Sequence, residues 1–253
     1  MLCTLIIAIY GVIVNILLSN DDGYKSSGLK ALKNVLENYG NVTTVAPHRD
    51  ISASSSCLSV HGPVEINKIS ANFYKVYGTP ADCVHIASRG ILKKIPDIVF
   101  SGVNIGSNMG DDVIYSGTVG AAIEGRHSKY GSVAISIASK NPKHTDELHQ
   151  TLEHIIEHIF HKLIKQKTIM NINIPDLSFS KIKGIKITKL GKRQLPLRAS
   201  VLKKDKKKFF NIGKVGKGIS TAGNDFHAIE KGYISITPLT IDMTNNIIYK
   251  KIK

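Results

Sequence analysis

Apolar runs of strand length alternate with helical patterns along the first two-thirds of the chain. From about Ser27, apolar positions recur every three or four residues, which places Leu29, Leu32 and Leu36 on one face of a helix. Strand–helix alternation with short connections predicts a parallel sheet that helices cover on both faces. The predicted strands span residues 15–19, 41–47, 97–102, 132–139 and 168–175, and further helices are predicted from Pro80, over 118–130 and over 145–165.

Two short β-like segments lie between the second and third predicted strands, and the pattern changes after residue 181. Residues 64–69 and 73–78 predict a surface hairpin, and after residue 181 short β-like runs replace the alternation. We therefore expect an α/β fold with a three-layer, Rossmann-like parallel core over residues 14–178. Residues 179–253 are expected to form a basic, antiparallel β-hairpin extension that closes the fold and takes part in oligomerisation.

The first residues, MLCTLIIAIYGVI, are almost continuously apolar. They lack the basic start and the small-residue cleavage site of a signal peptide, and they run without a break into the first predicted strand. We interpret residues 1–13 as an over-extended gene start, because a GTG start codon would place the first residue at Val14. A membrane anchor is the alternative interpretation.

Composition adds a strong positive charge to an ordinary globular background. Of 253 residues, 42% are hydrophobic and 21% are charged, and the formal net charge is +15. Residues 181–217 carry fourteen Lys or Arg and one acid, Asp205, so this stretch holds nearly the whole imbalance. It is interpreted either as a solvated loop or as a rim that attracts phosphates, nucleotides or polyanions. No helix-turn-helix or zinc motif accompanies the lysines, so a sequence-specific nucleic-acid module is not expected.

Cysteine usage indicates the compartment. Cys3, Cys57 and Cys83 are odd in number and widely spaced, so they predict neither a disulfide framework nor a CxxC metal site. This usage is typical of a reduced, cytoplasmic protein. We expect that location and no membrane partner.

Polar clusters follow three of the predicted strands. They cover residues 20–23, 46–56 and 101–125, and any one of them alone is typical of a turn. Because ligands bind outside the carboxyl ends of parallel strands in open α/β sheets, three such clusters at one edge favour a site. Asp21 and Asp22 are adjacent carboxylates that repel each other, which a cation between them would relieve.

The side chains of these clusters are oxygen donors. Asp21 and Asp22 supply carboxylates, Asn104 supplies an amide carbonyl, and a serine of the second cluster supplies a hydroxyl. This set suits Mg²⁺ or Mn²⁺, which keep positions open for water and a substrate phosphate.

A candidate anion site follows the third cluster. Ser116, Gly117 and Thr118 stand at the start of a predicted helix, whose free N–H groups and dipole attract phosphate. Asp21 is also a candidate general base or acid.

Several blocks of the sequence resemble the SurE family of stationary-phase survival proteins. The most specific are NILLSNDDG, GTPADCV and PDIVFSGVNIGSNMGDDVIYSGTVGAAIEG, and the resemblance extends in order over residues 14–243. It implies a divalent-metal-dependent phosphomonoesterase that removes phosphate from nucleoside 5′- and 3′-monophosphates, with some exopolyphosphatase activity. It also implies one metal ion per subunit on Asp21, Asp22, Ser52 and Asn104, and a homodimer or homotetramer that exchanges the C-terminal hairpin.

Departures from the family pattern and other motifs leave alternatives open. Ile51 precedes the predicted serine ligand where the family has a polar residue, and Ser54 is a second serine two positions on. His154 and His158 form an H-x-x-E-H motif on a predicted helix, which is typical of a zinc metallopeptidase. The same residues also fit the polar side of an amphipathic helix. A non-catalytic nucleotide-binding module is the third alternative, since fold alone does not give activity.

Overall fold

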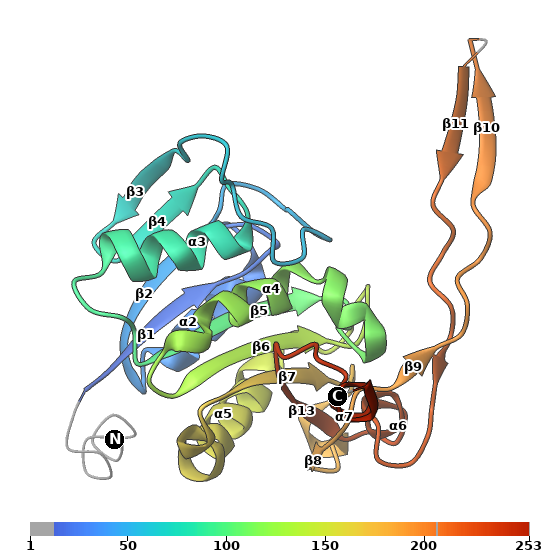
Figure 1. The fold of residues 1–253 in the computed structure, drawn as a ribbon. Helices are drawn as coiled ribbons and strands as arrows, with labels where there is room; N and C mark the ends of the chain where they lie inside the picture. The colour runs from blue at the N-terminus through green and yellow to red at the C-terminus, as the bar shows by residue number, and fades with distance from the viewer. Residues whose placement is uncertain (1–12, 206, 253) are drawn as a thin grey trace.

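One twisted sheet forms the centre of the molecule (Figure 1). The computed structural model describes residues 13–205 and 207–252, and within them nine strands belong to this sheet. They are β1 (Val14–Ser19), β2 (Gly40–Pro47), β3 (Ile66–Ser70), β4 (Phe73–Val76), β5 (Ile98–Ile105), β6 (Gly131–Ile137), β7 (Thr168–Ile174), β8 (Ile185–Ile187) and β13 (Ile234–Leu239).

The strand order confirms the predicted parallel core. It runs β3-β4-β2-β1-β5-β6-β7-β13-β8, and the six strands from β4 to β7 in this order are parallel. The predicted hairpin is β3 with β4, which pair antiparallel. The order reverses direction between β1 and β5, and the crevice outside the carboxyl ends of such strands is where ligands bind.

Helices cover both faces of the sheet, as expected for three layers (Figure 1). The helices α2 (Ser27–Leu36) and α5 (Leu148–His158) lie on one face, and α3 (Pro80–Ile86) and α4 (Gly117–Glu124) lie on the other. Helix α3 begins as predicted, with Pro80 at its first position. Thr79 and Asp82 form a reciprocal capping box.

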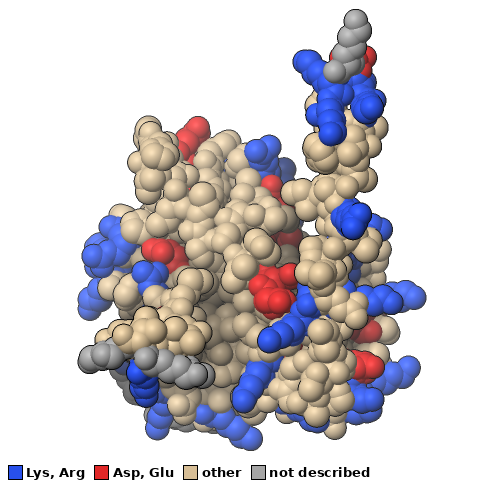
Figure 2. Space-filling view, turned by 45° about the vertical axis from the view of Figure 1, so that its right-hand side comes forward, with Lys and Arg blue, Asp and Glu red and all other residues tan. Residues whose placement is uncertain are grey.

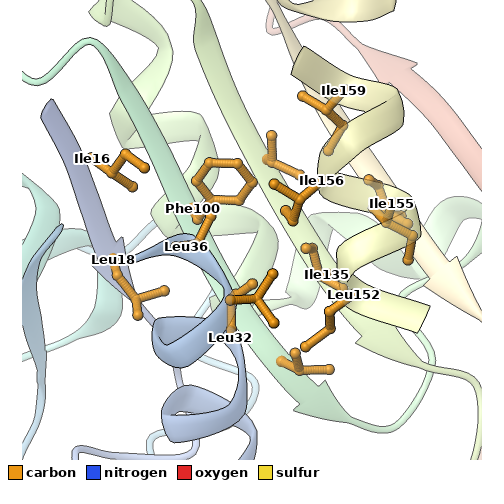
Figure 3. Packing of buried hydrophobic residues seen from close by; sticks show 14 of the residues in the cluster. Ile16, Leu18, Leu32, Leu36, Phe100, Ile135, Leu152, Ile155, Ile156 and Ile159 are labelled. Atoms are coloured by element: carbon orange, nitrogen blue, oxygen red, sulfur yellow. The ribbon is translucent and has the colours of Figure 1, made fainter. Parts of the chain in front are cut away.

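The two faces of β1 divide the core. Ile16 and Leu18 face α2 and α5, whereas Leu17 faces α3 and α4, because side chains alternate along a strand. Figure 3 shows the larger cluster, in which α2 contributes Leu32 and Leu36 and α5 contributes Leu152 and Ile156 to one apolar layer on the sheet. Each such buried side chain stabilises the fold by about 1.5–3 kcal/mol, so this layer fixes the positions of the strand ends.

The C-terminal residues continue the sheet and add a projecting arm. Strand β13 pairs antiparallel with β7, and β8 pairs with β13 in parallel rather than in the antiparallel arrangement predicted. The remaining elements are the 3₁₀ turn η6 (Phe179–Lys181), the strands β9 (Lys192–Arg193), β10 (Ser200–Lys204), β11 (Lys207–Asn211) and β12 (Gly218–Ile219), and the helices α6 (Asp225–Glu230) and α7 (Asn246–Ile252).

We define the hairpin arm as residues 194–205 and 207–217, which extend away from the body of the molecule (Figure 1). Strands β10 and β11 pair antiparallel within it. Large apolar side chains are exposed along it, including Leu195 at 91% and Ile212 at 96%. Lysines gather at its tip, where Figure 2 shows a blue cluster.

Three predicted elements have different ends in the structure. Helix α4 ends at Glu124 instead of residue 130, and a 3₁₀ turn, η3 (Gly125–His127), follows it. Gly125 packs against Val99, where a Cβ would lie 2.6 Å from the valine. Helix α5 ends at His158, and a π turn and a 3₁₀ turn follow it to Gln166, one residue beyond the predicted end at 165. Strand β5 continues to Ile105, and its pairing with β6 shifts register between Ser101 and Asn104.

No helix in the described part of the chain is long and apolar enough to cross a membrane. The interpretation of residues 1–13 as an over-extended start falls almost entirely outside the described residues, which begin at Ile13.

Candidate metal and phosphate site

The turn after β1 presents two carboxylates at the centre of the sheet edge. The Asn20 side-chain amide donates to the Gly23 carbonyl at 3.0 Å and closes this turn. Gly23 has φ +94°, and a Cβ there would lie 2.8 Å from the backbone of Arg49. Only glycine fits this position, and the turn that it allows leaves Asp21 and Asp22 side by side.

Asp21 is buried, and a single hydroxyl orients it. Thr118 Oγ1 donates to Asp21 Oδ1 at 2.6 Å. Burial raises the pKa of Asp21, while the Thr118 hydrogen bond acts in the opposite direction. For Asp22, burial and then the negative charges of Asp21 and Asp50 raise the pKa to about 6. The two carboxylates therefore resist ionising together, which is the electrostatic state that a bound cation relieves.

The loop after β2 brings a third carboxylate and two serines to the same place. The backbone N–H of Ile51 donates to the Asp21 carbonyl at 2.9 Å, which fixes this loop to the end of β1. Ser52 is exposed, and both its N–H and its hydroxyl donate to Asp50 Oδ1, at 2.8 and 2.6 Å. The hydroxyl of Ser54 is buried and has no hydrogen-bond partner among the described residues.

The register shift in β5 delivers Asn104 to the sheet edge. Its Nδ2 donates to the Gly106 carbonyl at 2.7 Å, so the amide presents its carbonyl oxygen as a free acceptor. Asn104 is 8% exposed. An amide carbonyl oxygen is one of the ligands that hard cations accept.

Helix α4 begins directly beside Asp21. Ser116 is its N-cap, and the Ser116 hydroxyl accepts a hydrogen bond from the Val119 N–H at 3.1 Å. A Cβ at Gly117 would lie 2.8 Å from Ser54 Oγ and 3.2 Å from Asp21 Oδ2, so glycine keeps this space open. The Thr118 hydroxyl already gives its proton to Asp21, whereas the Ser116 hydroxyl only accepts, so the helix offers a phosphate the Ser116 proton, free backbone N–H groups and its dipole.

A network of asparagines supports Thr118 from behind. Asn108 Nδ2 donates to Thr118 Oγ1 at 3.3 Å and to Ser136 Oγ at 2.8 Å. The side-chain amides of Asn171 and Asn173 both donate to the Asn108 carbonyl. A chain of hydrogen bonds therefore connects β7 to the Asp21 carboxylate through one hydroxyl.

The C-terminal part of the chain clamps the segment that leads into α4. Asp225 is fully buried and accepts hydrogen bonds from the N–H groups of Gly110 and Gly191, at 2.7 and 2.8 Å. Arg193 pairs with Asp112 and donates its backbone N–H to Asp111. The 3₁₀ turn η2 (Gly110–Tyr115), and with it the start of α4, is thus positioned by residues more than 80 positions further along the chain.

Comparison with known proteins adds a decisive observation at this point. A family model described as Survival protein SurE matches residues 16–196. The chain belongs to the SurE family. Proteins named 5′-nucleotidase SurE from Histophilus somni (strain 2336) and Ruthia magnifica subsp. Calyptogena magnifica are each 44% identical to it, over 91% of this chain and 94% of the relative. The crystal structure of the Sure protein from Aquifex aeolicus is 40% identical, with a TM-score of 0.83, and covers 94% of this chain and 98% of that one.

The donor atoms of this SurE family member fit a hard divalent cation. Carboxylates from Asp21 and Asp22, the free carbonyl of Asn104 and a serine hydroxyl are all oxygen ligands, which Mg²⁺ and Mn²⁺ prefer. Within the described residues no group of three or more His, Cys, Asp and Glu side chains could hold a metal, so a site here needs the amide and hydroxyl.

Sequence reasoning missed Asp50, the asparagine network and the C-terminal clamp. Asn171 and Asn173 alternate along one strand, which places them on one face, but nothing local shows that this face meets Asn108. Asp50 lies three residues after the predicted second strand, inside the polar cluster of residues 46–56, and could have been included as a third carboxylate.

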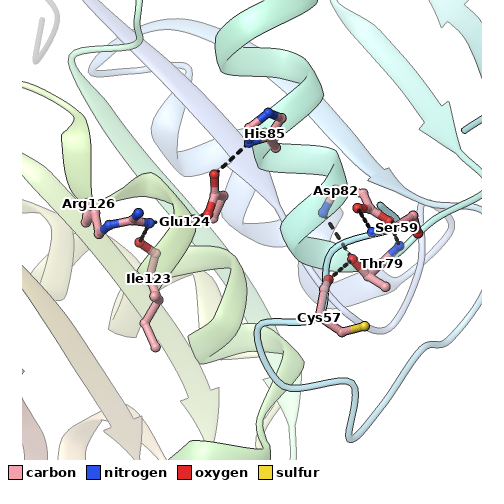
Figure 4. Close-up of polar contacts among 8 residues, drawn as sticks. All are labelled: Cys57, Ser59, Thr79, Asp82, His85, Ile123, Glu124 and Arg126. Carbon is pink, nitrogen blue, oxygen red and sulfur yellow. Dashed lines mark hydrogen bonds and ion pairs between the residues drawn. The ribbon is translucent and has the colours of Figure 1, made fainter. Parts of the chain in front are cut away.

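A cavity of about 570 Å³ lies away from this site, at the other ends of α3 and α4. There, Glu124 accepts from His85 Nδ1 at 2.8 Å and from Arg126 Nη1 at 3.3 Å, which ties the two helices together (Figure 4). Figure 4 also shows Asp82 at the start of α3, where it accepts hydrogen bonds from Ser59 and so holds the loop after β2.

The H-x-x-E-H motif lies on α5 but forms no metal site. His154 packs edge-to-face against the ring of Phe179, and His158 is half-buried beside Lys162. In the described part of the chain no third ligand joins them. Nothing in the fold or in the relatives favours the metallopeptidase alternative.

Proposed function

We propose that this chain is a divalent-metal phosphomonoesterase that removes phosphate from nucleoside 5′- and 3′-monophosphates. The observation that carries the proposal is the adjacent pair Asp21 and Asp22, which faces the start of α4 in a chain 44% identical to proteins named 5′-nucleotidase SurE. The carboxylates supply a cation site, and the helix supplies an anion site within contact distance of it.

One divalent ion per subunit, Mg²⁺ or Mn²⁺, would be held by Asp21, Asp22, Ser52 and Asn104. When bound, such an ion polarises a phosphate ester and offsets the charge that develops on it. Ser54 is the alternative hydroxyl, because its oxygen is buried, unpartnered and close to Gly117.

The chain's own residues would position the phosphate and accept the proton of the attacking water. The backbone N–H of Gly117 and the proton of the Ser116 hydroxyl would bind phosphate oxygens at the positive end of α4, beside Thr118. The Thr118 hydroxyl holds Oδ1 of Asp21, which leaves Oδ2, the carboxylate oxygen that faces Gly117, to accept a proton from the attacking water. Asp21 is therefore our candidate general base.

Assembly and further substrates belong to the same proposal. We infer a homodimer or homotetramer in which a second copy covers the hairpin arm, because side chains such as Leu195 and Ile212 are almost fully exposed there. We also propose a cytoplasmic location, and polyphosphate as an additional substrate that the basic stretch would attract.

The test is phosphate release from a panel of 5′- and 3′-nucleotides and short polyphosphate, with Mg²⁺ or Mn²⁺ and with a chelator. We expect release only with metal, and a loss of at least about 100-fold in Asp21→Asn. Asp205→Asn is the matched control, since Asp205 is exposed in the hairpin arm, and we expect it to be unaffected.

Metal-independent release, or an unaffected Asp21→Asn variant, would contradict the proposal. Nucleotide binding without release would favour the non-catalytic module, and zinc-dependent peptide cleavage would favour the His154/His158 alternative.

A further inference from the structure

Asp50 is a carboxylate beside the proposed metal site that is not itself among the proposed ligands. One of its oxygens, Oδ1, accepts two hydrogen bonds from Ser52, from the N–H at 2.8 Å and from the hydroxyl at 2.6 Å. Both bonds are short, as is usual when the acceptor is ionised. The pair therefore behaves as one unit, in which the carboxylate fixes both the backbone and the side chain of the serine.

The direction of the hydroxyl bond decides what Ser52 can do. A serine hydroxyl has one proton and two lone pairs. Because the proton points to Asp50, the lone pairs of Ser52 Oγ point elsewhere and are available to a cation. A serine without this partner would rotate freely, and binding a cation would cost the entropy of fixing it.

The loop that carries Asp50 is fixed to the carboxylate pair. The Ile51 N–H donates to the Asp21 carbonyl at 2.9 Å, so Asp50 and Ser52 flank a residue that is bonded to Asp21, two positions after the end of β1. This bond brings Asp50 and Ser52, on either side of Ile51, next to the segment that carries Asp21 and Asp22, so three carboxylates lie in one region. Without a positive ion this arrangement is repulsive.

We propose that Asp50 is a positioning residue, which orients the Ser52 hydroxyl toward the divalent cation and adds the negative charge that draws the cation in. This inference rests on the metal site of the proposed function. An ordinary surface turn would also contain the bond from the Ser52 N–H to Asp50, so the test has to separate orientation and charge from turn formation.

The experiment is a titration of the metal-free protein with Mn²⁺, in which the electron paramagnetic resonance signal reports the free ion and no turnover is needed. The variants are Asp50→Ala, Asp50→Asn, Ser52→Ala, Ser54→Ala and the double variant Asp50→Ala/Ser52→Ala. Asn keeps an acceptor oxygen but removes the charge, whereas Ala removes both. Asp205→Asn removes one exposed charge at a distance, at a turn position with φ +50° that asparagine readily adopts, and serves as the control.

We expect Asp50→Ala to weaken Mn²⁺ binding by about 10–100-fold, the range typical of residues that orient metal ligands. Asp50→Asn should weaken Mn²⁺ binding less, because asparagine keeps an acceptor oxygen for Ser52. The weakening that remains should become smaller at high salt, because salt screens the charge of Asp50 in the unaltered protein but not its hydrogen bond. In the Ser52→Ala background, Asp50→Ala should have a clearly smaller effect, since the hydroxyl that it orients is gone.

Equal effects of Asp50→Ala in both backgrounds, or a change below about twofold, would overturn the inference while leaving the metal site intact. If Ser52→Ala does not weaken binding and Ser54→Ala does, Ser52 is no ligand and the inference also fails. Absence of Mn²⁺ binding by the unaltered protein would overturn the proposed metal site itself. Circular dichroism of each variant checks that the loop change leaves the fold intact, and Asp50→Asn provides the comparison if Asp50→Ala does not fold.

Discussion

Replacing Asp22 by Asn should stabilise the metal-free protein at neutral pH while it abolishes the response to metal. A carboxyl whose pKa rises from 3.8 to about 6 loses about 3 kcal/mol when it ionises in the folded protein. Because Asp22 is only partly buried, solvent screening reduces this to about 1–2 kcal/mol. In a chain of this length that gain corresponds to roughly 2–8 °C in Tm.

The pH dependence of stability shows that ionisation of Asp22 destabilises the fold. Between about pH 4 and pH 6 the folded protein holds a proton on Asp22 that the unfolded chain has released, so stability falls as pH rises through this window. The gain in Asp22→Asn should therefore be full above pH 6 and absent below pH 4. Burial raises the pKa of Asp21 as well, and its repulsion with Asp22 disappears in the variant.

The assay is urea unfolding at pH 4, 5, 6 and 8, first with a chelator and then with Mn²⁺. With metal, the unaltered protein should gain stability by mass action, and Asp22→Asn should gain little. A variant that is less stable than the unaltered protein at pH 8 in chelator would refute the reasoning, as would a difference that does not change with pH.

Three further changes test the surroundings of the site. Gly117→Ala should lower kcat/KM by at least about tenfold with a small change in Tm, because the new Cβ would lie 2.8 Å from Ser54 Oγ; normal activity would contradict this. Thr118→Val should lower kcat about tenfold and Thr118→Ser should retain it, since only the hydroxyl reaches Asp21; equal losses would point to packing instead. Asp225→Asn should lower the free energy of unfolding in urea by about 1–3 kcal/mol, because the buried carboxylate accepts hydrogen bonds from several N–H groups. A change below roughly 0.5 kcal/mol, the level of a surface substitution, would refute the clamp.

Much of the fold could be predicted because its signals are local. Alternation of strands and helices, the cap at Thr79 and the turn residues after β1 are each contained in a short stretch of sequence. The family resemblance is confirmed. Two of the sequence blocks that carry it, NILLSNDDG and the block that begins PDIVFSG, come together at the sheet edge.

What could not be predicted depends on contacts between distant residues. The bond between Gly110 and Asp225 joins positions 115 residues apart, and no periodicity reports such a pair. Thr118 was predicted only as part of a phosphate-binding helix start, yet in the folded chain its hydroxyl donates to Asp21 and accepts from Asn108. Helix α4 was predicted too long, since the chain changes to a 3₁₀ turn at Gly125, which packs against the distant Val99, and no periodicity reports that contact.

The central claim is that the oxygen atoms at the ends of β1 and β5 hold the cation on which phosphate release depends. The most direct measurement is an anomalous difference map from crystals of the protein soaked in Mn²⁺. The account predicts one peak per subunit, bonded to Asp21 and Asp22 and flanked by Asn104 and a serine hydroxyl. A map with no peak there, or with its peak beside His154 and His158, would contradict it.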